Sequence, residues 1–307
     1  MKTLTLNFKA ILLATISCIL WGSAFSVVKL GYSFFGISNG TAIIRILFAA
    51  YRFTLAGLLI LFVALLMKLS FRPVIKYWKT IGLIGIAQTF FQYVFFYIGL
   101  ANTEAVKSSI LTGTGVFFSM ILAHFYFKDD TMTKRKAIGA IIGFLGILVA
   151  NLTGESLNLT FALTGEGFII FATIVGAIAN IFVRVVTRDV HPVIVAGVQM
   201  TFGGVLLFIF GLIGASPLDM TYTPQGIGVL IYLAFLSATA FSIWFYLLSH
   251  YNVSAVSIHK FQIPMWGTLI SVVLLGETLT ISKIIALIMV VVGILVVNHN
   301  GFSWKNK

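Results

Sequence analysis

Long hydrophobic runs follow one another along the chain, and short polar stretches separate them. A helix that crosses a bilayer needs about 20 predominantly apolar residues. Runs of this kind cover residues 10–30, 44–67, 79–100, 106–127, 135–151, 166–186, 193–214, 226–249, 254–275 and 281–298. They are too long and too continuously apolar for barrel strands. The pattern predicts an all-α integral membrane protein with ten transmembrane helices.

Composition agrees with this prediction. Of the 307 residues, 60% are hydrophobic and 9% are charged, whereas about 25% are charged in soluble domains. The mean hydropathy is +1.08. The net charge of +12 does not indicate nucleic-acid binding, because the basic residues lie between hydrophobic runs, where the positive-inside rule places them. We therefore expect membrane lipid around the chain and no nucleic acid as partner.

The distribution of basic residues predicts the orientation. With the N-terminus in the cytoplasm, fourteen Lys and Arg residues fall inside and four fall at outer helix ends, namely Lys29, Arg45, Lys107 and Lys283. This bias places both termini in the cytoplasm of a multi-pass inner or plasma membrane protein. The first run resembles a signal peptide, but its length and the lack of a small-x-small cleavage site favour a retained helix.

An internal repeat divides the chain. The fifth run ends in GILVAN at 146–151, and the tenth ends in GILVVN at 293–298. The same offset of 147 places Asp130 and its three successors on Glu277 and its successors. We expect one repeat at 10–151 and another at 162–298, with five runs each. Because five is odd, the second half enters the membrane from the opposite side, as in inverted-repeat transporters.

At this point the sequence resembles a family. Trp21 to Phe25 read WGSAF, Arg52 is followed by Phe53, and Gly276 to Thr280 read GETLT. In this order these motifs resemble the EamA family of the drug/metabolite transporter superfamily, over nearly the whole chain. The resemblance implies two tandem repeats, peripheral fifth and tenth helices, and export of small amphipathic metabolites, often amino acids, through a central cavity. The first half departs from the pattern, since Lys128, Asp129 and Asp130 stand where the second half has Leu275, Gly276 and Glu277.

The ninth run carries polar groups that are costly in hydrocarbon. On a helical wheel Lys260 and Pro264 share one stripe, and a second stripe holds His259, Gln262 and Trp266. We expect one stripe to face a solute pathway and the other a neighbouring helix. Lys260 either snorkels to the cytoplasmic interface or contacts solute. Pro264 removes a backbone donor, so it is a candidate hinge or gate.

Other polar residues lie deep in the predicted helices. Arg52 is near the middle of the second run and has no acidic residue at its depth, so it either clamps helices or binds a solute anion. Further candidates for the pathway are an aromatic residue of the first helix and polar residues of the third, sixth and seventh: Trp21, Gln88, Gln92, Tyr93, Asn180 and Gln199. Buried amides often serve only as hydrogen-bonding contacts between helices.

Missing motifs narrow the function. The chain has no phosphate-binding GxxxxGK[ST] loop, no HExxH motif and a single cysteine, Cys18, so we expect no ATP hydrolysis, disulfide, metal or other cofactor. The deep charges are positive, which favours anionic or zwitterionic solutes, and His259 is the nearest titratable group if protons are coupled.

The sequence thus predicts a secondary transporter or exporter of small amphipathic metabolites, such as amino acids or other solutes that bear a carboxylate. It would work by alternating access as a monomer or homodimer. The alternative is an integral-membrane enzyme or flippase acting on a lipid-linked substrate. It would use the titratable groups His124, Asp129 and Asp130 at the inner face. No catalytic residue is expected in the preferred hypothesis.

Overall fold

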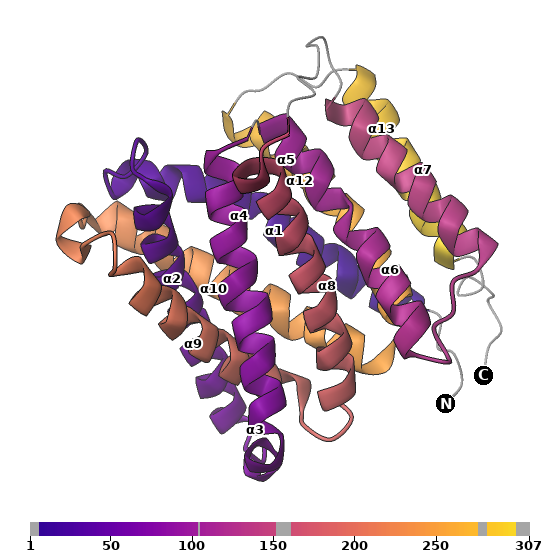
Figure 1. Cartoon of the computed structure of the whole chain (residues 1–307), viewed down its shortest axis with the longest axis horizontal. Helices are drawn as coiled ribbons and strands as arrows, with labels where there is room; N and C mark the ends of the chain where they lie inside the picture. The colour runs from indigo at the N-terminus through magenta and orange to yellow at the C-terminus, as the bar shows by residue number, and fades with distance from the viewer. Residues whose placement is uncertain (1–5, 104, 152–160, 276–280, 299–307) are drawn as a thin grey trace.

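The computed structural model describes residues 6–103, 105–151, 161–275 and 281–298, and in this part of the chain every regular element is helical (Figure 1). The first half holds α1 Phe8–Phe34, α2 Ala42–Leu66, α3 Arg72–Ile84, the π-helix η1 Gly85–Phe91, α4 Gln92–Ala101, α5 Ala105–Gly113, α6 Gly115–Tyr126 and α7 Lys134–Asn151. The second half holds η2 Leu163–Gly167, α8 Phe168–Val186, α9 Pro192–Gly211, η3 Pro217–Asp219, α10 Pro224–His250, α11 Val253–Ser257, η4 Ile258–Phe261, α12 Gln262–Leu275 and α13 Ile281–Asn298. The Glu277 motif lies outside the described residues.

Eight helical segments are long and apolar enough to cross a bilayer: α1, α2, α3 with η1 and α4, α6 with the end of α5, η2 with α8, α9, α10 and α13. The all-α membrane architecture is therefore confirmed. Two predicted spans fall outside this set for physical reasons. Three consecutive basic residues open α7, and the ninth run is divided among α11, η4 and α12. The count of ten spans stays a prediction.

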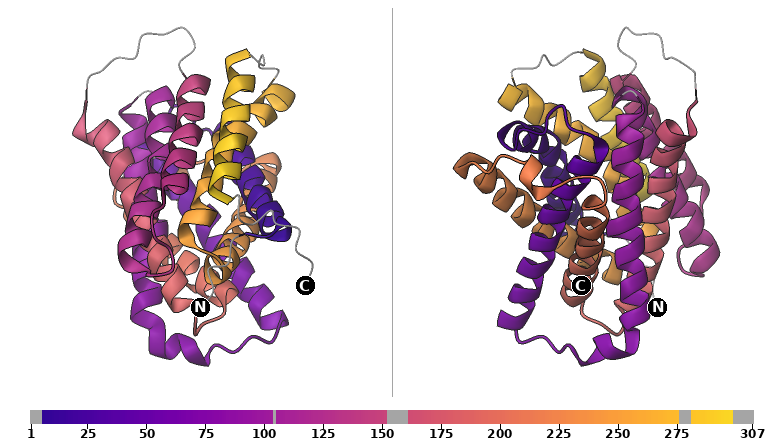
Figure 2. Two further views of the ribbon diagram at one scale, coloured as in Figure 1. Left: turned by 90° about the vertical axis from the view of Figure 1, so that its right-hand side faces the viewer. Right: turned by 60° about the vertical axis from the view of Figure 1, so that its left-hand side comes forward.

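Helix packing follows a pattern that repeats between the two halves. In the first half α1 packs on α10 and α12, and in the second half α8 packs on α4 and α6. The contact of α10 with α2 likewise corresponds to that of η1 with α9. Two pairs join counterparts directly, α2 with α9 and α7 with α13, and α7 and α13 stand together at one edge of the bundle (Figures 1 and 2). These pairs thus recur between equivalent helices of the two halves.

The contact between α2 and α9 is reciprocal. Thr54 and Gly57 of α2 lie 147 residues before Thr201 and Gly204 of α9. A Cβ atom added to Gly57 would overlap the Thr201 backbone, and one added to Gly204 would overlap the Thr54 backbone. Small residues permit this close approach of membrane helices. The duplicated motif therefore packs against itself.

The fourth and ninth runs are both interrupted, and at equivalent positions. Helix α5 ends at Gly113 and α6 begins at Gly115, while the 3₁₀ turn η4 separates α11 from α12. With the offset of 147, Gly113 corresponds to Lys260 and Gly115 to Gln262. Both breaks contain tight i to i−3 bonding; in the first, the Thr114 amide donates to the Leu111 carbonyl over 3.0 Å. The interruption is thus a property of both halves.

Candidate functional site

Arg52 lies inside the bundle, in the middle of α2, with 5% of its surface exposed. Its Nε donates a hydrogen bond of 2.8 Å to the hydroxyl of Ser237 on α10. That hydroxyl in turn donates to the Leu233 carbonyl over 2.8 Å. The guanidinium carbon also lies 5.0 Å from the centre of the Phe53 ring. The ion pairs among the described residues do not include Arg52.

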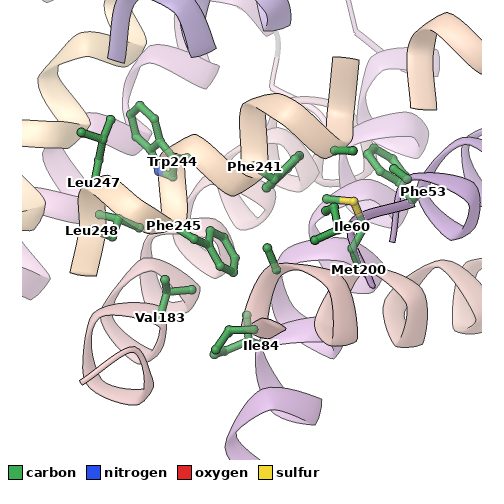
Figure 3. Close-up of a cluster of buried hydrophobic side chains, with 14 of the residues drawn as sticks. Phe53, Ile60, Ile84, Val183, Met200, Phe241, Trp244, Phe245, Leu247 and Leu248 are labelled. Carbon is green, nitrogen blue, oxygen red and sulfur yellow. The ribbon is translucent and has the colours of Figure 1, made fainter. Parts of the chain in front are cut away.

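An aromatic cluster connects Arg52 with Lys260. Phe53 and Phe241 lie 6.5 Å apart between ring centres, and Phe241 lies 5.2 Å from Trp21 (Figure 3 shows Phe53 and Phe241). The ring centres of Trp21 and Trp244 are 5.1 Å apart. The Lys260 ammonium lies over the Trp244 ring, 5.3 Å from its centre. The edge-to-face contacts in this cluster are the arrangement that aromatic quadrupoles favour. Arg52 and Lys260 therefore lie at opposite ends of one aromatic cluster, in which Phe53, Phe241 and Trp244 are buried.

Lys260 belongs to the 3₁₀ turn η4, between the two helical parts of the ninth run. It is half-buried, in contrast to its fully buried neighbours His259 and Phe261. Its ammonium lies 5.3 Å from the centre of the Trp244 ring of α10, and both alternatives for Lys260, snorkelling and solute contact, stay predictions. Pro264 is the third residue of α12. In a first helical turn the missing amide of proline costs little, because no intrahelical acceptor is available there.

The second polar stripe of the ninth run forms its own hydrogen-bond chain. The Trp266 indole donates to Gln262 Oε1 over 3.2 Å, and the Gln262 amide nitrogen lies 2.8 Å from His259 Nδ1. On the other side of the ring, His259 Nε2 faces the side-chain amide of Asn298 in α13 at 3.5 Å. In this stripe His259 faces α13, whereas Trp266 packs against Gly22 of α1.

The predicted amide residues gather between the third, sixth and seventh spans. Thr89 donates to Gln199 Oε1 over 2.9 Å, and Gln92 lies directly over Gly176 of α8, where a Cβ would overlap its amide oxygen. Helices α4 and α8 run in opposite directions, with Gly99 beside Ile169.

Several of these amide atoms are buried without a hydrogen-bond partner among the described residues. They are Gln88 Oε1, Gln92 Oε1, Gln199 Nε2 and both side-chain polar atoms of Asn180. Buried polar atoms are normally paired with protein or water. Tyr93, next to Gln92, packs against Phe53 with the ring centres 4.2 Å apart and the rings tilted by 42°. The amide group therefore adjoins the aromatic cluster and retains unused polar capacity.

A small cavity lies beside the second part of the ninth run. A cavity of about 30 Å³ between α12 and α13 is lined by Met265, Thr268, Leu269, Lys283, Ile284 and Leu287. A volume of this size holds about one water molecule, so it is too small for a metabolite.

His124, Asp129 and Asp130, at one end of the bundle, were the titratable groups that the enzyme alternative would use. Asp129 pairs with Arg184 NH2 over 2.7 Å, and Asp130 pairs with Lys136 over 2.7 Å. His124 Nδ1 accepts the Met132 amide over 3.1 Å. These carboxylates are committed to ion pairs.

Ser237 and Asn298, which contact Arg52 and His259, carry no sequence signal that distinguishes them from other polar residues in apolar runs.

Comparison with known proteins identifies the family. The model of the EamA-like transporter family matches the chain twice, at residues 8–152 and 163–299. The chain belongs to the EamA-like transporter family. Among its relatives is the uncharacterized transporter YyaM of Bacillus subtilis, 24% identical over 282 residues, or 89% of this chain and 88% of that protein. A probable amino-acid metabolite efflux pump of Salmonella typhimurium is 28% identical over 303 residues and 94% of either chain.

A solved crystal structure shares this EamA fold, with a TM-score of 0.81 over 98% of this chain and all of the other, at 15% identity. The family and its relatives establish a multi-pass membrane transporter and not an enzyme, which removes the lipid-linked enzyme alternative. Across the described residues, groups of three or more metal-binding side chains are also absent.

Proposed function

We propose that this EamA protein transports small amphipathic solutes that bear a carboxylate. The observation that carries the proposal is the placement of Arg52 and Lys260 at two ends of one aromatic cluster. A charge inside a membrane protein is costly unless it serves a partner, and neither cation has a carboxylate partner among the described ion pairs. The solute's carboxylate would meet a cation, and its apolar body would lie on Trp21 and Phe241.

We further propose alternating access between two inverted repeats, 10–151 and 162–298. Supporting this, α2 and α9 run antiparallel, since Gly197 meets Leu61 at one end and Gly211 meets Leu47 at the other. Helices α7 and α13 show the same reciprocity, with Gly139 against Gly293 and Gly146 against Ala286. A two-fold axis in the membrane plane relates elements in this way. The amide group would orient the polar part of the solute.

The face at which α2, α6, α8 and α10 end, called the basic face here, would be cytoplasmic. Exposed basic side chains gather on it: Lys68, Arg72, Lys76, Lys79, Lys128 and Arg188. Hydrogen bonds join segments of the two halves at this face. Tyr77 donates to Asp189, and Arg184 donates to Asp129. The positive-inside rule supports this orientation, and outward transport then means movement away from the basic face.

Counterflow in proteoliposomes tests the proposed solute class. Vesicles preloaded with 3-phenylpropionate should accumulate the labelled compound, whereas the isosteric 3-phenylpropionamide should exchange at least tenfold more slowly, because it offers no charge to Arg52 or Lys260. Phenylalanine tests whether an added ammonium is tolerated. Equal exchange of the acid and the amide would overturn the proposed role of the cations. Lys128→Gln, which removes an exposed basic-face charge, should leave the preference unchanged.

A further inference from the structure

The start of the ninth span is held at the basic face by a set of charged and polar contacts. The residues are Asp129, Asp130, Arg184, Asn252 and Ser254, and we call them the Arg184 clamp. They come from three separate places: the turn between α6 and α7, the last turn of α8, and the α10–α11 turn together with the first turn of α11. These places belong to both repeats, so the clamp crosses between the two halves of the transporter.

Asp130 is the centre of the clamp and is completely buried. Its carboxylate accepts the Ser254 amide over 3.0 Å and also the Ser254 hydroxyl. It therefore caps the first turn of α11, where amides have no intrahelical acceptor. Lys136 lies 2.7 Å from one carboxylate oxygen, and Arg184 NH1 lies 3.8 Å from the other.

Arg184 connects the remaining members. Its NH2 donates to Asp129 Oδ2 over 2.7 Å and to Asn252 Oδ1 over 3.2 Å. Asn252 returns a hydrogen bond of 3.1 Å to the Asp129 carbonyl. The guanidinium carbon also lies 4.3 Å above the Phe127 ring. A buried ion pair of this kind adds little net stability, although breaking one partner is costly, so its presence calls for a role other than stability.

The contacts on the opposite face join different elements. There the Thr221 amide donates to the Phe35 carbonyl over 3.0 Å, which links the α9–α10 turn with the end of α1. Thr103 donates to Glu166 over 2.7 Å, which links the end of α4 with η2. The α11 segment, which leads directly into Lys260, is tied at the basic face.

We propose that the Arg184 clamp is a latch that closes the pathway at the basic face and positions η4, and that it must release before Lys260 becomes accessible from that side. The proposal rests on the proposed transport function, because a latch has meaning only where a pathway opens. Asp130 and Arg184 would act as positioning residues, through α11, and would not contact solute.

Cysteine accessibility tests the latch without any solute. Ser257 ends α11, is fully buried, and its hydroxyl has no hydrogen-bond partner among the described residues. In a Cys18→Ser background, a polar maleimide should label Ser257→Cys slowly in detergent, well below the melting temperature. Adding Arg184→Gln should raise the labelling rate at least tenfold, and Asp129→Asn should raise it several-fold. Arg184→Lys should return the rate toward that of the parent.

Arg188→Gln is the matched control, because Arg188 lies one turn further along and is exposed. It removes the same charge from the same face and should not change the rate. The latch is overturned if neither clamp variant accelerates labelling, or if Arg188→Gln accelerates it equally. Should Arg184→Gln aggregate, Asp129→Asn decides the question. Faster labelling in a protein that exchanges no carboxylate would retain the latch and reject the proposed solute.

Discussion

Arg52 of α2 and Gln199 of α9 stand at the same position of two related segments. They lie 147 residues apart, and each is followed by a Thr two residues later and a Gly five residues later. Each also hydrogen-bonds a hydroxyl on a helix of the other half: Arg52 donates to Ser237 of α10, and Gln199 accepts from Thr89 of η1. The geometry is thus duplicated, while the charge is present on one side only.

The fourth and ninth spans show the complementary difference. Both are broken at the same place, yet the first half has Gly113 where the second has Lys260. Each half therefore contributes one cation, at positions that do not correspond. A carboxylate would meet different partners on the two sides of the aromatic cluster. Duplication explains the shared helix packing of the two halves. The two cations, each present in one half only, explain the proposed solute preference.

Replacing Arg52 with glutamine, the residue at the equivalent position 199, should have the largest effect on transport. Arg52→Gln removes the charge but keeps a donor for Ser237, so the fold should survive. Hydrogen bonds to charged groups contribute about 1.5–3 kcal/mol, and about 1.4 kcal/mol corresponds to tenfold in affinity. We therefore expect 3-phenylpropionate counterflow to fall by about 10- to 100-fold. The measurement is initial exchange at subsaturating solute, normalised to reconstituted protein.

The reciprocal position supplies the control for Arg52. Gln199→Leu leaves Thr89 without its acceptor, so it should lower the melting temperature, yet the preference for the acid over the amide should persist. If Gln199→Leu abolished this preference as fully as Arg52→Gln did, the charge difference between the halves would not be what selects solute.

Substitutions of Gly57 and Gly204, which occupy equivalent positions in α2 and α9, should lower stability alike. They test whether the contact between these helices is equivalent in the two halves. A Cβ on Gly57 or on Gly204 would overlap backbone of the partner helix, and overpacking of this kind costs about 1–3 kcal/mol. Gly57→Ala and Gly204→Ala should therefore lower the melting temperature by similar amounts, measured in detergent. Gly228→Ala is the control, because nothing lies within 4 Å of the added atom. A large fall for one glycine alone would show that the contact is not equivalent in the two halves.

Hydropathy and the repeated motifs were enough to predict the membrane architecture and the family, because long apolar runs have few stable alternatives in lipid. Two features of the structure could not be predicted from the sequence. The partners of Arg52 and His259, Ser237 and Asn298, depend on how distant helices pack. The acidic pair Asp129 and Asp130 was recognised as titratable, but its pairing with Arg184 joins segments 55 residues apart.

The interruption of the ninth span should depend little on its proline, and this is the smallest effect we expect. The sequence marked Pro264 as a candidate hinge, but the fourth span is interrupted at the equivalent place without proline. Pro264→Ala adds a backbone amide in the first turn of α12. Because alanine leaves the unfolded chain more conformational freedom, the substitution changes the free energy of unfolding by about 0.4–1 kcal/mol. The melting temperature should shift by a few degrees at most, and counterflow should stay within about threefold of the parent. Lys260→Met, which leaves Pro264 in place, should reduce exchange far more. A loss of transport in Pro264→Ala with Lys260 intact would mean that the proline itself, and not the duplicated break, provides the hinge.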